Sequence, residues 1–363
     1  MAQTLSKIAA IQKELLHALR ANHWKVGDKL PADGELAQQF DCGLGTIGRA
    51  LALLAHDGWV ERKTRVGTRV LRTGTEQAGV QMDALAFVYP STQHEGIWKM
   101  AKGFQNAAKQ AGRRVVMLST GSDYAKEAEY IARLSEFDVR GAMTCPNISS
   151  PEEQVQFSQL LVQSKFPVVL GGTNFPGLGC SAATIDRFHV GYTMTRHLLA
   201  QGLRRIGYFS NLSWVGSLHD TYQGYCWALD EAGIRERTEW STLEPSVVID
   251  FDEPVRESIG MGRNFLARYS DLEGVVAASD YLALGLMAAA QERGWRVPED
   301  LKITGADDFV LSLQAAVPLT TYRVPYEDVG RRCFALLQER VLRVESPVQV
   351  ETLRGEIVVR ASA

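Results

Sequence analysis

The sequence predicts an α/β protein in two parts: a small helical module that ends in a β-hairpin, and a larger body of parallel sheets flanked by helices. Residues 1–71 combine apolar stripes at helical spacing with two short strand patterns. From Ala84 onward, short apolar runs alternate with helical periods, as in parallel sheets covered on both faces. We expect domains at 1–71 and 84–363, joined by a polar, glycine-containing linker at 72–83.

The first module should contain three helices and a hairpin. The helices are expected over Ser6–Asn22, Pro31–Phe40 and Leu44–His56, with Asp33 placed to cap the second. Two strands follow, around a turn in which Gly67 can adopt a positive φ. A helix-turn-helix followed by a basic hairpin is a winged helix-turn-helix, a device that enters a DNA groove. The first partner that the sequence predicts is therefore double-stranded DNA.

The charge distribution agrees with this assignment. The formal net charge is −3, from 39 Lys/Arg and 42 Asp/Glu. Residues 1–75 hold 11 and 7 of these, a net charge of +4, which leaves −7 on the remainder. A basic module on an acidic body suits the binding of a polyanion by the module alone.

Composition excludes several other classes of protein. The 5 cysteines are far apart and form neither metal-ligand nor CxxC spacing, so we expect reduced thiols, no metal and no cofactor. The N-terminus lacks an apolar signal region, and no run of 18 apolar residues occurs, so we expect a cytoplasmic protein with no membrane segment. Loops typical of nucleotide binding or hydrolysis are missing, and Asp307-Asp308 lacks a third group for acid–base work, so we expect no enzyme.

Two resemblances cover more than nine-tenths of the chain. Residues 27–70 look like the winged helix-turn-helix of GntR-type bacterial transcription regulators. Residues 84 to about 340 resemble the periplasmic-binding-protein-like effector domain of LacI/GalR-type repressors. The segments that carry this second resemblance include 103–112, 184–186, 204–208, 278–285, 297–301, 305–308 and 318–321. The combination of the two is similar to the arabinose-repressor subgroup.

The GntR-type resemblance implies that the helix over Leu44–His56 lies in the major groove and that the hairpin contacts the minor groove or the backbone. The residues that it nominates for DNA contact are Thr46, Arg49, Arg62, Lys63, Arg65, Gly67, Thr68 and Arg69. The sequence departs from the family at Gly34, Leu44 and Gly48, where arginines are usual. We therefore expect an unusual operator sequence, with affinity resting mainly on the basic wing and on dimerisation.

Strand-end residues of the body are expected to form a polar cleft, because ligands of parallel sheets bind beyond the carboxyl ends of the strands. Carboxylates and amides hold hydroxyl pairs, while an aromatic face stacks on a sugar ring. The LacI-type resemblance points to the same positions and adds a histidine further on. The effector residues so predicted are Gln93, His94, Trp98, Asp186, His219, Phe251, Asp280 and Asp307.

The sequence thus predicts a ligand-responsive transcription regulator, a repressor that binds operator DNA and a sugar-like small molecule. The body should have two lobes, with the chain crossing near 185–190 and again near 318–325. Closure of the lobes would change the spacing of two DNA heads in a homodimer, for which we nominate the helices Trp98–Gln110 and Leu282–Arg293. Two alternatives stay open: a solute-binding protein, and a sensor whose degenerate head no longer binds DNA.

Overall fold

The computed structural model divides the chain into two compact units, Met1–Met82 and Asp83–Ala363, which are described separately below. The residues that it describes are 2–21, 23–56, 58–63, 67–71, 73, 84–90, 94–121, 123–146, 148, 150–164, 166–211, 215–235, 240–244, 250, 253–342 and 346–363. Most of the predicted linker lies outside these residues. Among the described helices, none has the length and apolarity needed to cross a bilayer.

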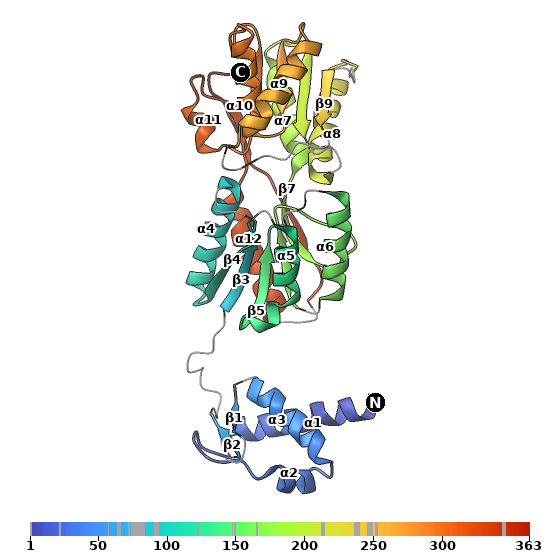
Figure 1. Ribbon diagram of the computed structural model, residues 1–363, viewed down its shortest axis with the longest axis vertical. Coiled ribbons are helices and arrows are strands. Elements are labelled where there is room, and N and C mark those ends of the chain that lie inside the picture. The colour runs from blue at the N-terminus through green and yellow to red at the C-terminus, as the bar shows by residue number, and fades with distance from the viewer. Residues whose placement is uncertain are drawn as a thin grey trace. The chain divides into compact units, whose positions relative to one another are not determined.

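The first unit is a three-helix domain with a two-stranded antiparallel hairpin (Figure 1). Its elements are α1 (Ala2–Arg20), α2 (Asp33–Gln39), α3 (Leu44–His56), β1 (Val60–Lys63) and β2 (Gly67–Val70). The apolar stripes of the three helices meet in one core, which Val60 and Val70 of the hairpin complete. This is the predicted helix-turn-helix with a wing, held together by its own hydrophobic core.

One local prediction in this unit is wrong. Ala32 precedes the first residue of α2, and Asp33 is already inside the helix. The backbone N–H of Ala32 donates to the Glu35 carboxylate at 2.8 Å, so the acidic side chain that satisfies this helix start comes from three residues further on. The Asp33 carboxylate is thereby free to bind Arg62.

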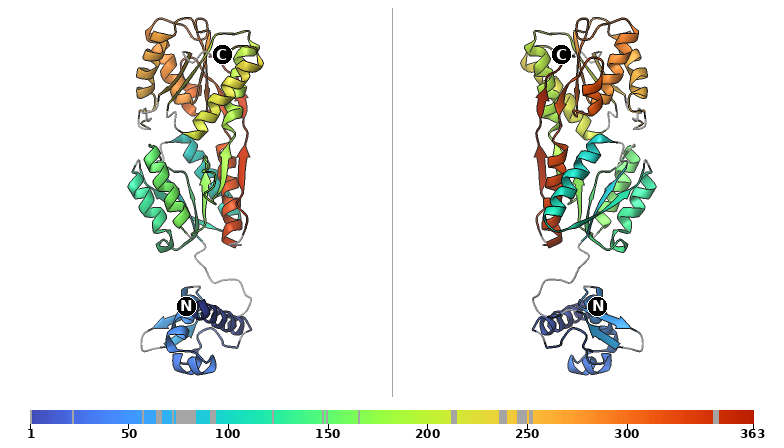
Figure 2. Two further views of the ribbon diagram at one scale, coloured as in Figure 1. Left: turned by 90° about the vertical axis from the view of Figure 1, so that its right-hand side faces the viewer. Right: turned by 90° about the vertical axis from the view of Figure 1, so that its left-hand side faces the viewer.

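The second unit contains two lobes, each a six-stranded sheet with helices on both faces (Figures 1 and 2). The N-terminal lobe has the strand order β13-β7-β6-β5-β3-β4, all parallel. Its elements are β3 (Ala84–Tyr89), α4 (Glu95–Gln110), β4 (Arg114–Ser119), α5 (Tyr124–Ala132), η1 (Leu134–Glu136), β5 (Val139–Thr144), α6 (Pro151–Gln163), β6 (Val168–Gly171), β7 (Ser181–Ile185), α12 (Tyr326–Leu342) and β13 (Val350–Leu353). The strands at its centre are buried along their whole length, as expected for a sheet covered on both sides.

The C-terminal lobe has the order β14-β12-β11-β10-β8-β9, parallel except for the edge pair β12–β14. Its elements are α7 (Arg187–Ala200), β8 (Ile206–Asn211), α8 (Gly216–Glu231), β9 (Ser241–Glu244), α9 (Arg256–Arg268), β10 (Gly274–Ala277), α10 (Asp280–Glu292), β11 (Lys302–Ala306), α11 (Val310–Gln314), β12 (Thr320–Arg323) and β14 (Glu356–Val358). Both lobes therefore present the carboxyl ends of parallel strands, the edge at which ligands bind in such sheets.

The chain passes between the lobes three times. The first two passages, from β7 into α7 and from β12 into α12, fall where the sequence predicted them. A third runs from β13 to β14 and was not predicted, because these two short strands carry little apolar periodicity. Each passage is short, so the polar groups beside it are held close to both lobes.

Candidate functional site

The exposed surface of α3 begins at its first turn. Leu44 and Arg49 are exposed and Thr46 is partly exposed, whereas Ile47 and Leu51 are buried in the head. The predicted groove-facing residues thus lie on the solvent side of this helix. Side chains in the first turns of a recognition helix are those that reach base edges in helix-turn-helix complexes.

Arg62 has a partner on each of the two helices. Its guanidinium donates to the Gly48 carbonyl oxygen at 2.9 Å and to the Asp33 carboxylate at 2.5 Å. A charge that is already paired has less to offer a phosphate. Arg62, predicted as a DNA contact, therefore fixes the wing against α2 and α3 in this structure.

The wing strand β2 alternates between exposed and buried residues. Gly67, with φ of 102°, and Arg69 are exposed, while the Thr68 side chain is only 4% exposed. The burial of Thr68 follows from strand alternation, so its side chain is not at the exposed surface of the wing in this structure. Lys63 is described only by its backbone, and Arg65 lies outside the described residues.

One basic residue of this surface was missed. Lys29 forms an isolated antiparallel bridge with Arg69, and both side chains are exposed. Like charges opposite each other across strands are unfavourable in the free protein. A nearby polyanion removes that cost, so Lys29 and Arg69 form a candidate phosphate contact. The signal was present in the sequence as the basic residue before Leu30-Pro31.

A cavity of about 630 Å³ lies between the two lobes of the body. Its wall contains hydroxyls, amides and carboxylates beside two aromatic rings, the mixture that suits a small polyhydroxylated ligand. The lining residues come from strand ends, from the start of α8 and from β13, and they are Pro146, Ile148, Gln154, Thr173, Asn174, Phe175, Pro176, Thr184, Ile185, Asp186, Arg187, Phe188, Val215, Gly216, Ser217, Asp220, Val350 and Thr352.

Among the predicted effector residues that the structure describes, Asp186 lines this cavity. Its carboxylate caps α7 by accepting the backbone N–H of His189 at 2.9 Å. It also binds Nε of Arg354 at 2.7 Å, from the third passage between the lobes. The side chain is thus positioned from two elements at the hinge, which keeps its orientation fixed.

Arg187, the next residue, was missed by sequence reasoning. It lines the cavity, lies 3.7 Å from the Asp307 carboxylate and donates to the Tyr326 hydroxyl. Its buried Nε has no hydrogen-bond partner within the described structure. An under-satisfied guanidinium in a cavity wall is a candidate ligand donor. The available signal was its position two residues after the end of β7.

A contact between the lobes surrounds Phe309. Its ring lies 5.6 Å from the His94 ring, 5.6 Å from Nζ of Lys99 and 6.0 Å from the Tyr326 ring. The backbone N–H of Val310 donates to Glu95 at 2.8 Å. The first turn of α4 therefore holds the loop over 307–310 of the other lobe, a segment that we call the Phe309 loop.

Strain and burial mark the start of the Phe309 loop. Asp307 and Asp308 have φ of 118° and 56°, in a region that non-glycine residues rarely adopt. Tyr326 donates to Asp307 at 2.6 Å, and burial raises the pKa of Asp307 to about 6. Burial, opposed in part by a backbone hydrogen bond, lowers the pKa of His94 to about 4. Both groups therefore titrate far from their usual pH.

Asp280 is fully buried behind this loop. Its carboxyl accepts the Thr321 hydroxyl at 2.5 Å and the Phe309 backbone N–H at 2.8 Å. Burial and, second, the charge of Asp307 raise the pKa of Asp280 well above its usual range. In this structure Asp280 and Asp307 hold the Phe309 loop, and neither lines the cavity.

The remaining predicted effector residues lie apart from the cavity or outside the described residues. The Trp98 side chain is 52% exposed on α4. His219 is exposed on α8, where its Nε2 lies 3.1 Å from Nε2 of Gln223. Gln93 and Phe251 are not among the described residues. Strand-end residues do line the cavity, and helix rotation decides which of the neighbouring side chains face it.

The fold and these two sites define a class: a transcription regulator with a winged-helix head and a two-lobed small-molecule-binding body. Comparisons with known proteins agree. Residues 7–70 match the model of the bacterial regulatory proteins of the gntR family, and residues 195–363 match that of the periplasmic binding protein-like domain. The chain therefore combines a GntR-type DNA-binding domain with a periplasmic-binding-protein-like effector domain.

Curated relatives extend over nearly the whole chain. An arabinose metabolism transcriptional repressor from Geobacillus stearothermophilus is 24% identical, with 99% of this chain and 98% of the relative covered. A repressor of the same name from Halalkalibacterium halodurans is 26% identical, covering 97% of this chain and 94% of the relative. A solved structure of a transcriptional regulator CelR–cellobiose complex is 22% identical, with a TM-score of 0.68 over 92% of this chain and all of that one.

Proposed function

We propose that the protein is a repressor that binds double-stranded operator DNA through its head and a sugar or sugar derivative through its body. The observation that carries this proposal is the cavity of about 630 Å³ in a chain with a winged-helix head. Its wall combines hinge residues and strand ends of the N-terminal lobe with the starts of α7 and α8 in the C-terminal lobe. A ligand in that cavity contacts both lobes at once. Its binding free energy therefore depends on how far they are closed, which is the requirement for coupling to DNA.

On the DNA side, Thr46 and Arg49 are assigned to base edges in the major groove. Arg69 and Lys29 are assigned to phosphates, together with Lys63, Arg65 and the backbone at Gly67. This division follows from exposure: the first pair lies on the solvent side of α3, and the described wing cations lie on exposed strand positions. Arg62 is assigned to positioning, because its guanidinium is held by Asp33 and Gly48.

On the effector side, Asp186, Arg187 and Asp220 supply charged groups for ligand hydroxyls. Phe175 and Phe188 supply aromatic faces in the same cavity wall. The named relatives include arabinose repressors and a regulator solved with cellobiose, which supports a carbohydrate ligand. We further propose that the protein acts in the cytoplasm, where operator DNA is found.

A homodimer is part of the proposal. Around α10, a hollow of about 480 Å³ is lined by apolar and aromatic side chains that include Leu284, Met287 and Trp295. Leu313 on the adjacent α11 is 59% exposed, and Trp98 on α4 is also exposed. Exposed apolar surface at the two nominated helices suits a self-complementary interface. Sedimentation of a monomer at micromolar concentration, with and without operator DNA, would contradict it.

The proposal is tested by gel shift on the DNA upstream of the protein's own gene, across a salt series. We expect binding that weakens steeply with salt, and release of DNA by a sugar. Arg69→Ala should weaken binding to all sequences and lower the salt slope by about 0.9 for the lost phosphate contact. Thr46→Ala and Arg49→Ala should instead change the preference among operator variants.

The two alternatives give other results. A solute-binding protein or a sensor with a degenerate head would show no salt-dependent shift on this or any genomic fragment, while still binding its ligand. Binding of DNA with no response to any carbohydrate would leave the regulator in place and remove the sugar assignment. Thermal-shift measurements with the same sugars on the unmodified protein separate these outcomes.

A further inference from the structure

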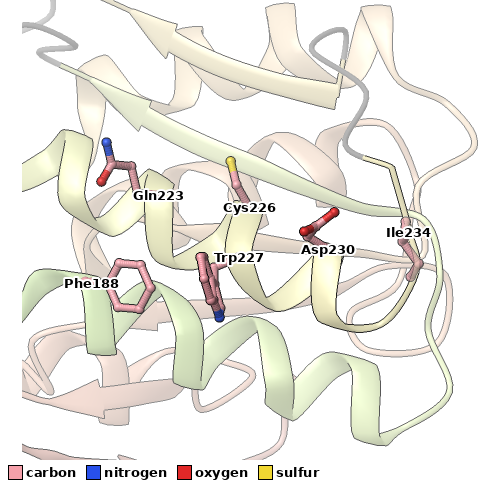
Figure 3. A pocket seen from close by; sticks show the side chains of 6 residues that line it. All are labelled: Phe188, Gln223, Cys226, Trp227, Asp230 and Ile234. Carbon is pink, nitrogen blue, oxygen red and sulfur yellow. The ribbon is translucent and has the colours of Figure 1, made fainter.

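A second hollow lies on the outside of the C-terminal lobe, along α8. It measures about 740 Å³ and is lined by Phe188, Gln223, Cys226, Trp227, Asp230 and Ile234 (Figure 3). Phe188 also lines the cavity between the lobes. The two hollows therefore meet at one aromatic ring, and we call the outer one the α8 groove.

One face of α8 runs through both hollows. Gly216 and Asp220 line the cavity, and Gln223, Trp227 and Asp230 line the α8 groove. Residues spaced alternately by four and three lie in one stripe on an α-helix. From Asp220 to Trp227 this stripe climbs about 10 Å, at about 1.5 Å per residue. A ligand seated in the cavity at Asp220 can therefore extend along the same stripe into the groove.

The position of Phe188 beside this stripe is set by close backbone contact. A Cβ on Gly224 of α8 would lie 2.0 Å from the carbonyl oxygen of Phe188, so this glycine allows α8 to rest on the start of α7. The Phe188 ring then lies 6.3 Å from the Trp227 ring, inclined at 63°. Trp227 is oriented by its own Nε1–H, which donates to Glu231 at 3.0 Å. The two rings form a positioned pair.

The chemistry of the groove matches that of the cavity. Phe188 is 37% exposed and Trp227 is 57% exposed, so both rings offer apolar faces to solvent. Gln223 and Asp230 flank them and can accept or donate hydrogen bonds to hydroxyls. Aromatic faces beside an amide and a carboxylate suit a sugar ring, which has apolar C–H faces and a polar rim.

We propose that the α8 groove is a second sugar subsite, and that the effector is a disaccharide or longer oligosaccharide. One ring occupies the cavity between the lobes, and the next stacks on Phe188 and Trp227. This inference rests on the proposed function, because it requires the first ring to bind in the cavity.

The test compares each monosaccharide with its own oligomers by isothermal titration calorimetry on the full-length protein. Four series are used. Glucose is compared with cellobiose and cellotriose, and separately with maltose and maltotriose. Xylose is compared with xylobiose, and arabinose with arabinobiose. In one series, we expect the disaccharide to bind at least about tenfold more tightly than its monosaccharide. Trp227→Ala should remove that gain and leave the monosaccharide affinity within about twofold.

Variants distinguish stacking from general damage. Trp227→Phe keeps an aromatic face and should retain most of the gain, whereas Trp227→Gln should lose it. Val162→Ala truncates another exposed apolar side chain, on α6, and should change neither affinity. Equal gains from the second sugar ring in the unmodified protein and in all four variants would overturn the subsite. Tight binding of a monosaccharide with no gain from a second ring would overturn it while sparing the proposed function, and no binding of any probe would overturn both.

Discussion

Arg62 on the wing strand and Asp33 on α2 form an ion pair at 2.5 Å. The same guanidinium donates to the Gly48 carbonyl oxygen of α3 at 2.9 Å. This approach does not require glycine at position 48, because a Cβ there would lie 3.9 Å from the guanidinium, in ordinary contact. One arginine thus connects α3, α2 and the wing, so it fixes the position of the wing strand relative to the two helices.

Arg62→Ala should therefore loosen the head, whereas Arg69→Ala should not. The ion pair is partly exposed, so we expect a modest loss of about 1 kcal/mol in the head. Hydrogen exchange at the α2 and α3 amides should accelerate in Arg62→Ala and stay unchanged in Arg69→Ala. Equal exchange in both variants would assign Arg62 to direct phosphate contact instead.

His94 and Asp307 give opposite pH dependences to the stability of the body. Burial lowers the pKa of His94 from 6.5 to about 4, so the unfolded chain takes up that proton first and stability is lost as pH falls through this window. Burial raises the pKa of Asp307 from 3.8 to about 6, so the folded chain keeps that proton longer and stability is lost as pH rises through its window. Between about pH 4 and 6 the two contributions oppose each other.

Single substitutions should expose each contribution. His94→Asn keeps a side-chain oxygen that can cap α4. As pH falls from about 6.5 to 4, this variant should lose less free energy of unfolding than the unmodified protein, by at most about 3 kcal/mol. Asp307→Asn should make stability rise more steeply from about pH 4 to 6. Urea unfolding followed by tryptophan fluorescence measures both, and curves parallel to the unmodified protein would exclude these titrations.

Much of the fold could be predicted because its signals are local. The apolar stripes of α1 and α3 and the buried strands of the body are visible as sequence periods. The passage from β13 to β14 was missed, because Val350 and Glu356 begin short strands whose pairing depends on distant partners. Local periodicity carries no information on such pairing.

The candidate site was predicted in part for the same reason. Asp186 follows a strand directly, so its place at the cavity edge could be inferred. Arg187 acquires its role from Asp307 and Tyr326, which are distant in sequence. His219 shows the converse limit: the resemblance nominated it as an effector residue, but the rotation of α8 places Asp220, not His219, in the cavity wall.

The contact between α7 and α8 depends on two glycines. A Cβ on Gly191 would lie 1.9 Å from the Thr221 carbonyl oxygen, and one on Gly224 would lie 2.0 Å from that of Phe188. Gly224→Ala must push the helices apart and should lower the free energy of unfolding by about 1–3 kcal/mol. Gly260→Ala is the matched control, because it lies inside α9 with no atom within 4 Å of its Cβ position. That control should be neutral or stabilising by up to about 1 kcal/mol.

Arg187 and Asp307 should be energetically coupled, and the coupling should depend on pH. The guanidinium lies 3.7 Å from a carboxylate whose pKa is raised to about 6 by burial. Above that pH both the Arg187 guanidinium and the Asp307 carboxylate are charged. Arg187→Gln then leaves a buried carboxylate without its cation. At about pH 5 the carboxyl is mostly protonated, and the same substitution should cost less.

A double-mutant cycle of Arg187→Gln and Asp307→Asn measures this coupling directly. At about pH 7.5 the double mutant should lose less free energy of unfolding than the sum of the two single-mutant losses, by about 1 kcal/mol or more. This difference should become smaller toward about pH 5. The cycle also bears on signalling, because Arg187 lines the cavity while Tyr326, which it contacts, begins α12 of the N-terminal lobe at the end of the second passage. Additive losses at both pH values would mean that Arg187 senses ligand without engaging Asp307, and the Phe309 loop would then need another connection to the cavity.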